Sequence, residues 1–176
     1  MRGFFYVVKT VKLFTMLEEL QTVTYQELLI RIGLAALFGC LLGLDRDMKN
    51  KPVDFRAFMI VCVSTCLVAI LGQELYATYA NQDGFISLDL GKIISGALTG
   101  IGFLGAGAIL KNNDSNQVIG TATGASIWGS SIIGLCLGFG YITLAIAGFI
   151  TVFFILLIIG CFYEFICGKS DKEKRD

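Results

Sequence analysis

The sequence predicts an all-α fold: a polytopic membrane helix bundle of five short, glycine-rich transmembrane helices, preceded by an amphipathic N-terminal segment. The chain of 176 residues is 55% hydrophobic and 16% charged, whereas ordinary soluble domains are roughly 25% charged. Its apolar residues fall into runs close to the ~20 residues with which a helix crosses a bilayer. Many of its 21 glycines lie in these runs, where small residues let membrane helices approach one another closely.

The N-terminal segment, residues 1–22, has apolar side chains at helical spacing with Lys9, Lys12 and Glu19 between them. It is too short and too interrupted to cross a bilayer, so we expect an interfacial helix or a loose extension. Met16 is an alternative start of the chain. Residues 23–166 form the predicted transmembrane domain, and residues 167–176 form a charged cytoplasmic tail.

The five predicted spans cover residues 25–44, 56–76, 91–110, 118–139 and 141–165. Local signals mark two of their N-termini. Thr24 and Glu27 have the spacing of a capping box, and Asp89 is a favourable N-cap for the third span. The junction Gly138-Phe139-Gly140 is so short that spans four and five must be antiparallel neighbours.

Basic residues in the short loops predict the orientation, because lysine and arginine collect on the cytoplasmic side. The loops after spans one and three share one side with the C-terminal tail and hold most of these residues. They are Arg46, Lys49, Lys51, Arg56, Lys111, Lys169, Lys172, Lys174 and Arg175. Arg2, Lys9 and Lys12 in the N-terminal segment favour the opposite orientation. The majority predicts an N-terminus outside and a cytoplasmic C-terminus.

Stripes of small residues predict how the helices meet. The candidate packing residues in spans one and three are Gly39, Gly43, Gly96, Gly100, Gly102, Gly105 and Gly107. Span four carries Ser126, Ser130, Gly134 and Gly138 at intervals of four. We therefore expect spans one, three and four to form a tight bundle, with the bulkier spans two and five at its flanks. The stripes fit plain helix packing, or a sliding or pore-lining surface. They exceed what one five-helix bundle needs, so we expect a homo-oligomer, with a dimer favoured.

Charged groups at the span ends are the first candidate functional residues, since an intramembrane charge is costly. Asp45 and Arg46 end span one and Arg56 opens span two. This predicted charge cluster is either a buried ion-pair group, a port for a charged partner, or an ordinary solvated loop. On the opposite side, Arg31, Glu74 and Lys92 either anchor the helices at the interface or form pairs centred on Glu74.

Span four is unusually polar. Its candidate residues are Thr121, Thr123, Ser126, Trp128 and Ser130. The hydroxyls either bond back to carbonyls of their own helix or line a polar path. Trp128 lies mid-span, away from the interfacial belt where tryptophan is common, so we expect it to pack inside protein.

Several function classes are disfavoured by composition. Fourteen basic residues balance fourteen acidic ones, so nucleic acid is not an expected partner. The chain has no histidine and lacks an evident nucleophile pair, so we expect neither an enzyme nor a cofactor or metal site. Cys62 and Cys66 share a helix face, but without further soft ligands they favour core packing. The string Gly100-Ile101-Gly102-Phe103-Leu104-Gly105 lacks the strand and acidic residue of a dinucleotide site.

Three blocks of the chain resemble the MgtC/SapB family of bacterial inner-membrane proteins. They are Gly39-x-x-x-Gly43-Leu44-Asp45-Arg46, the run from Gly100 to Ile109, and the segment from Val118 through Thr123 and Ala125 to Trp128. In the first block aspartate stands where the family usually has glutamate. The family's loop motif, Ala-Gly-Leu-Arg-Thr, reads Val53-Asp54-Phe55-Arg56-Ala57 here, so only Arg56 matches.

The resemblance implies a multi-pass protein of the bacterial plasma (inner) membrane, in the short form without the soluble C-terminal domain of longer members. It also implies a link to magnesium limitation, acid stress or virulence and, in the best-known members, binding of the F-type ATP synthase. The leading hypothesis is a regulatory protein that acts through helix–helix contact with membrane partners. The alternative is a small-solute or ion transporter or channel subunit.

Overall fold

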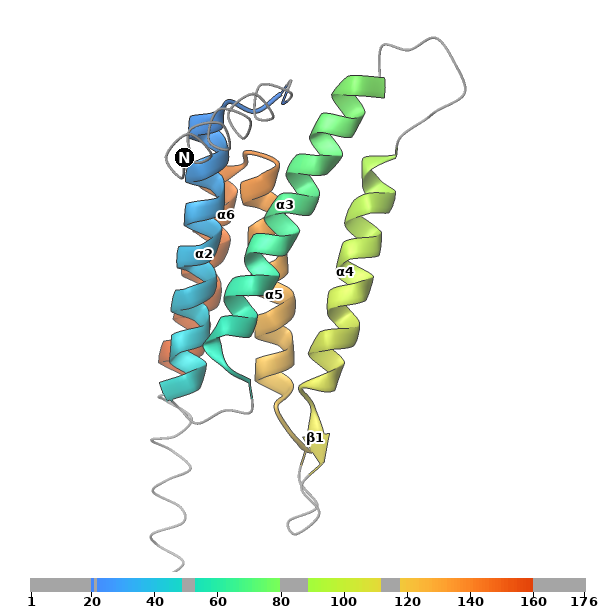
Figure 1. Cartoon of the computed structure of the whole chain (residues 1–176). Coiled ribbons are helices and arrows are strands. Elements are labelled where there is room, and N and C mark those ends of the chain that lie inside the picture. The colour runs from blue at the N-terminus through green and yellow to red at the C-terminus, as the bar shows by residue number, and fades with distance from the viewer. Residues whose placement is uncertain (1–19, 21, 49–52, 80–88, 112–117, 160–176) are drawn as a thin grey trace, which may run out of the picture.

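The structure is a computed structural model, which describes residues 20, 22–48, 53–79, 89–111 and 118–159. The predicted charged tail lies outside these residues, as does nearly all of the predicted N-terminal segment. The described chain is a bundle of helices that run up and down beside one another (Figure 1). This confirms the all-α prediction for the described residues, apart from one short β-hairpin.

The helices follow the predicted spans closely. They are α2 (Tyr25–Met48), α3 (Phe55–Tyr79), α4 (Leu90–Gly107), α5 (Thr121–Gly138) and α6 (Ile142–Phe154), which continues as the π-helical η1 (Ile155–Ile159). The sequence predicted that spans three and four remain helical up to the loop that joins them. Instead, β1 (Leu110–Lys111) pairs antiparallel with β2 (Val118–Ile119) at the lower end of the bundle in Figure 1. The hydrogen bonds between the two strands satisfy backbone N–H and C=O groups that lie outside the helices.

The predicted local signals are largely present. The Asp89 side chain accepts a hydrogen bond from the Gly91 N–H at 2.9 Å, which confirms the N-cap of α4. Glu27 accepts from the Thr24 N–H at 3.3 Å, one of the two bonds of a capping box. Helices α5 and α6 are joined by a tight turn in which Gly140 has φ +83°, so they are the predicted adjacent pair.

The predicted arrangement of the spans is wrong in one respect: α3, the second span, is the centre of the bundle. It packs against α2 on one side, α5 on another, and α4 along part of its length. Helix α4, the third span, lies at the edge of the bundle (Figure 1), and Gly105 is its only buried residue. Helix α6 is a flanking helix, as expected.

Glycines create the close contacts around α3. A Cβ at Gly39 would lie 2.8 Å from both the Phe58 O and the Met59 Cα. A Cβ at Gly134 would overlap the Cys62 O of α3 in the same way from α5. Both helices therefore approach the backbone of α3, and their glycines are required there because any side chain would push the helices apart. Phe58, Cys62 and Cys66 fill the middle of the core with no exposed surface.

Three described helices are long and apolar enough to cross a membrane: α2, α3 and α4. Among the described residues, α6 and η1 form a shorter apolar helix, Ile142–Ile158. Helix α5 has 18 residues, but its buried positions include threonine, serine and glycine, which lower its hydropathy. Four polar residues of α5, namely Thr123, Ser126, Ser130 and Ser131, are therefore placed against protein.

Candidate functional site

A buried ion pair lies at the end of α2. Phe38 and Leu42 begin a buried stripe on α2, and Asp45 and Arg46 continue it, with only 8% and 6% of their surfaces exposed. The Arg46 Nε lies 3.8 Å from the Asp45 Oδ2. Within the described part of the chain the Arg46 Nε has no hydrogen-bond partner. A buried charged group of this kind costs stability unless a partner compensates it.

Arg56 does not join this buried pair. Its side chain is 75% exposed, and its Nε lies 3.6 Å from the Asp54 Oδ2. The Asp54 Oδ1 also accepts a hydrogen bond from the Arg56 N–H at 3.1 Å. The three residues of the predicted charge cluster therefore lie in two environments: Asp45 and Arg46 are inside the bundle, and Arg56 is in an exposed local ion pair.

The serine hydroxyls of α5 are buried and bond to carbonyls of their own helix. Thr123, Ser126 and Ser130 are buried, whereas Thr121 is exposed. Ser126 donates to the Ala122 O at 2.6 Å, and Ser130 donates to the Ile127 O at 2.8 Å. These bonds satisfy the hydroxyls without a ligand or a water chain.

The glycines predicted for packing divide into two groups. Gly39, Gly43 and Gly105 are buried against neighbouring backbone; Gly105 meets Gly124 of α5, where its Cβ would lie 3.0 Å from the Gly124 O. The others, all on α4, have no atom from another part of the chain within 4 Å of the place a Cβ would occupy. They are Gly96, Gly100, Gly102 and Gly107. Four of the seven predicted packing glycines thus have no packing partner within the described chain.

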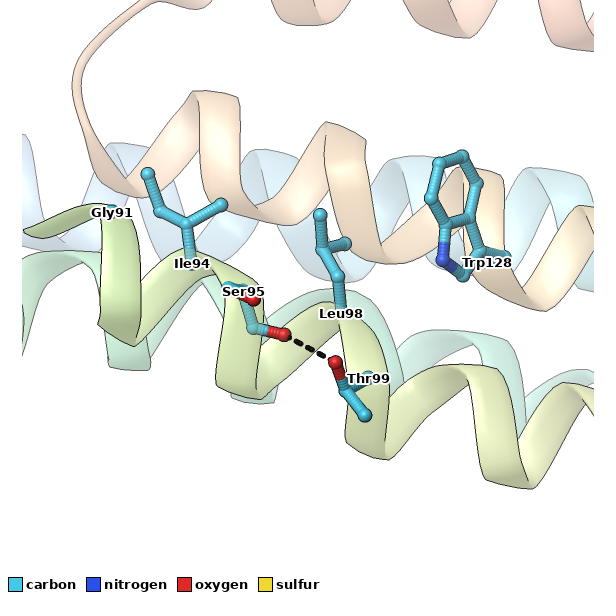
Figure 2. Close-up of a pocket in the computed structure, with 6 residues that line it drawn as sticks. All are labelled: Gly91, Ile94, Ser95, Leu98, Thr99 and Trp128. Atoms are coloured by element: carbon cyan, nitrogen blue, oxygen red, sulfur yellow. Dashed lines mark hydrogen bonds between the residues drawn. The ribbon is translucent and has the colours of Figure 1, made fainter.

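Trp128 was expected inside the protein, and that expectation is wrong for this chain, because 44% of the residue is exposed. It borders an open groove between α5 and the N-terminal half of α4. The groove is lined by Gly91, Ile94, Ser95, Leu98, Thr99 and Trp128. Figure 2 shows Ile94 and Leu98 on the side of α4 nearer to Trp128. Thr99 donates its hydroxyl hydrogen to the Ser95 O at 2.8 Å, so the groove is mainly apolar.

At the opposite end of the bundle, Arg31 has a role that the sequence did not reveal. It donates from Nη1 to the Gly138 O at 2.8 Å and contacts the Gln73 Oε1 at 3.3 Å. Gln73 in turn donates from Nε2 to the Phe139 O at 3.2 Å. Both side chains therefore cap the C-terminal end of α5. Gln73 was missed as a candidate, although a polar residue within an apolar span was the available signal.

The pairs expected around Glu74 are replaced by others. Glu74 is buried and accepts hydrogen bonds from the N–H and the hydroxyl of Thr22, at 3.0 Å for the N–H. Arg31 pairs with Glu27 at 4.0 Å, and Lys92 pairs with Asp89 at 4.0 Å. Glu74 thus fastens the segment that precedes α2 to α3.

No group of three or more histidine, cysteine, aspartate or glutamate residues that could hold a metal ion occurs within the described ranges. The profile of the MgtC family matches residues 32–165, which is more than half of the chain. The chain belongs to the MgtC family.

The matched relatives span several bacterial groups. Protein SapB of Bacillus subtilis is 36% identical over 117 residues, which cover 65% of this chain and 49% of SapB. An Escherichia coli protein named "Putative magnesium transporter YhiD" is 32% identical over 147 residues, or 84% of this chain and 66% of the relative. Protein MgtC of Brucella abortus is 31% identical over 109 residues, or 62% of this chain and 41% of that protein. No solved structure matches the chain significantly.

The MgtC family match and the apolar helices together identify a membrane protein. The matched segment includes the buried Asp45–Arg46 pair, all of α4, and the groove at Trp128. The chain spans about half to two thirds of the length of the relatives that match it first. What those whole proteins do is therefore carried to this chain only as a proposal.

Proposed function

We propose that this MgtC-family chain is a regulatory protein of the bacterial plasma membrane, which acts through helix–helix contact with membrane partners. In this proposal α2, α3, α4, α5 and the α6–η1 helix each cross the bilayer, and the N-terminus lies outside. Its physiological setting would be the one the family resemblance implies, namely magnesium limitation, acid stress or virulence.

The observation that carries the proposal is the closed interior between α3 and α5. Gly134 and Gly138 bring α5 onto the backbone of α3 at Cys62 and Cys66. The buried hydroxyls of Ser126 and Ser130 are already bonded to their own helix. A transport path needs polar groups that face an opening, and the described interior between these helices has neither feature. A regulator that works by surface contact needs no such path.

The charges support the proposed orientation. The C-terminal end of α2, the N-terminal end of α3 and the strand β1 lie at the same end of the bundle (Figure 1). Arg46, Arg56 and Lys111 are at this end, which is the cytoplasmic end if basic residues remain inside. Reporter tags at the two termini test this: an odd number of crossings puts them in different compartments. Tags that report one compartment would contradict it.

A small-solute or ion transporter is the second candidate. The buried Asp45–Arg46 pair favours it, since charged residues within membrane segments commonly mark ion or substrate pathways. The name of the Escherichia coli relative agrees with this alternative. In this case Arg46 would act near an inner gate and α4 would have to move away from α5 to open a route.

The two candidates differ in a flux measurement. The protein is purified, reconstituted in liposomes, and assayed with a magnesium-sensitive dye trapped inside. The regulatory proposal expects no flux above that of empty liposomes. Flux that Arg46→Met abolishes, and that the exposed-site control Arg56→Met leaves intact, would refute it in favour of transport. Cross-linking in native membranes then tests for a bound partner directly.

A further inference from the structure

We propose that Glu74 and Thr22 form a latch that responds to protonation. The latch holds the segment before α2 against α3 while the Glu74 carboxylate is ionised, and it loosens when the carboxylate takes up a proton. The two residues are here called the Glu74 latch, and the segment it holds is residues 22–24. This inference goes beyond the proposed function, because it holds whether the chain regulates or transports.

The Glu74 latch joins two parts of the chain that are far apart in the sequence. Thr22 donates its N–H to the Glu74 Oε1 at 3.0 Å, across a separation of 52 residues, and its hydroxyl donates to the same oxygen. Glu74 lies near the C-terminal end of α3, at the same end of the bundle as the N-terminal end of α2 (Figure 1). One carboxylate oxygen therefore receives both polar donors of Thr22.

This contact also fixes the place where the chain enters the core. Val23, the next residue, is only 4% exposed and belongs to the hydrophobic core, whereas Thr22 and Thr24 on either side of it are exposed. The Thr24 N–H donates to Glu27 in the first turn of α2, so that bond does not reach α3. The bonds of Thr22 do, and we expect Val23 to lose its fixed position when they weaken.

The strength of these two bonds depends on the charge of Glu74. Hydrogen bonds to an ionised carboxylate are roughly twice as strong as bonds between neutral groups. A proton on the carboxyl group removes the charge and converts one of its oxygens into a donor. The latch is therefore closed at the higher pH, where Glu74 is ionised, and it weakens as the pH falls through the titration of this group.

The charged groups on the helices packed against α3 leave this role to Glu74. At this end of the bundle they are Glu27 and Arg31 on α2 and Asp89 and Lys92 on α4, while α5 has no charged residue. Arg31 and Lys92 each lie 4.0 Å from a carboxylate oxygen of Glu27 and Asp89, respectively. Arg31 also contacts Gln73, the neighbour of Glu74, so its positive charge favours the ionised carboxylate. The uncharged titratable residues at this end are Tyr25, Tyr76, Tyr79, Cys136 and Tyr141.

The test is a pH titration of the full chain in lipid nanodiscs, followed by nuclear magnetic resonance. Two signals are recorded from above neutral pH down to about pH 4, a range that includes the ordinary titration of glutamate: the Glu74 side-chain carboxyl carbon and the Thr22 amide proton. Both should move with one shared midpoint. Protection of the Thr22 amide against hydrogen exchange, relative to an unstructured chain at the same pH, should fall at least about fivefold on the acid side, since bonds to a neutral acceptor are weaker.

Three variants separate the latch from its surroundings. Glu74→Gln keeps an oxygen acceptor but cannot ionise, so Thr22 should show the low, acid-side protection at every pH. Thr22→Val keeps the N–H bond and loses the hydroxyl bond, so the amide should still titrate, with less protection at neutral pH. Glu27→Gln is the matched control: it removes the exposed carboxylate that bonds to Thr24 and should leave the response of Thr22 unchanged. Circular dichroism establishes that each variant folds.

Two kinds of result overturn the proposal. The first is a Thr22 amide that does not respond to pH in the wild type, or that responds in Glu74→Gln as it does in the wild type. The second is a Glu74 carboxyl group that takes up its proton while the protection of Thr22 stays constant, since the bonds would then not depend on its charge.

Discussion

Substitution of Gly39 by alanine should destabilise the bundle, whereas the same change at Gly33 on the same helix should not. Gly39 faces α3, where a new Cβ would lie 2.8 Å from the Phe58 O and the Met59 Cα. Gly33 faces open space, with nothing within 4 Å. Both substitutions replace glycine by alanine on α2. The difference between their free energies of unfolding therefore measures the effect of the contact with α3.

The expected magnitude follows from two opposing terms. Ordinary van der Waals contact begins near 3.4 Å, so α2 and α3 must separate by roughly half an ångström to admit the methyl group at Gly39. Overpacking of this kind costs about 1–3 kcal/mol, while alanine gains up to ~1 kcal/mol over glycine in helix propensity. Gly33→Ala should be neutral or gain up to ~1 kcal/mol. Because the same gain applies at both sites, Gly39→Ala should be about 1–3 kcal/mol less stable than Gly33→Ala.

Reversible unfolding by sodium dodecyl sulfate in mild detergent, followed by circular dichroism, measures both free energies. The single tryptophan, Trp128, gives a second signal on α5 from the same titration. Equal shifts for the two variants would refute the close α2–α3 contact on which the reasoning rests.

Three further substitutions test the two ends of the bundle by the same unfolding assay. Arg46→Met removes the cation that lies 3.8 Å from the buried Asp45 carboxylate and should cost about 3–5 kcal/mol, whereas Arg56→Met, at an exposed ion pair, should cost less than ~1 kcal/mol; equal effects would contradict their different burial. Arg31→Met removes a charged hydrogen bond to α5 and should cost about 1.5–3 kcal/mol. Glu27→Gln, which removes only the exposed ion-pair partner of Arg31, should cost less than ~1 kcal/mol. Gly140→Ala, at a left-handed φ of +83°, should cost about 1–2 kcal/mol, and unchanged stability would mean that the turn relaxes.

The helix ends could be predicted from the sequence because their signals are local. Asp89 caps α4 through its own side chain, and the start of α2 coincides with the predicted capping residues. The glycine turn between α5 and α6 was equally plain. These features depend on neighbours within a few residues, which the sequence contains in full.

The order of helix packing could not be predicted in this way. Glycine stripes on spans one, three and four suggested that these helices meet each other. A glycine, however, needs only an approachable backbone opposite it, and α3 offers one at Phe58 and Cys62. Glycines on α2 and α5 therefore meet two sides of a helix that contains only Gly72, and the glycines of α4 remain outside.

The candidate charge cluster shows where a usable signal was overlooked. All three residues stand at helix ends, so position alone does not separate Asp45 and Arg46 from Arg56. Arg46, however, follows Gly39 by seven residues and so lies on the same helix face, which is the face packed against α3. Arg56 follows the first residue of its helix and pairs with Asp54 outside it. The position of a residue around the helix relative to the buried glycines therefore distinguishes Asp45 and Arg46 from Arg56. The number of charged residues nearby does not.

The role of Arg31 follows from the backbone of α5 and not from its own charge. A helix leaves its last carbonyls without intrahelical donors, and such carbonyls need other partners where they are buried. The tight turn serves some of them: Phe139 N–H donates to the Leu135 O, Tyr141 N–H to the Cys136 O, and Gly140 N–H to the Leu137 O. The next two carbonyls, Gly138 and Phe139, have no such donor and receive Arg31 and Gln73 instead. A short connection between spans therefore requires donors from neighbouring helices, which makes isolated polar residues in adjacent apolar helices the place to look for them.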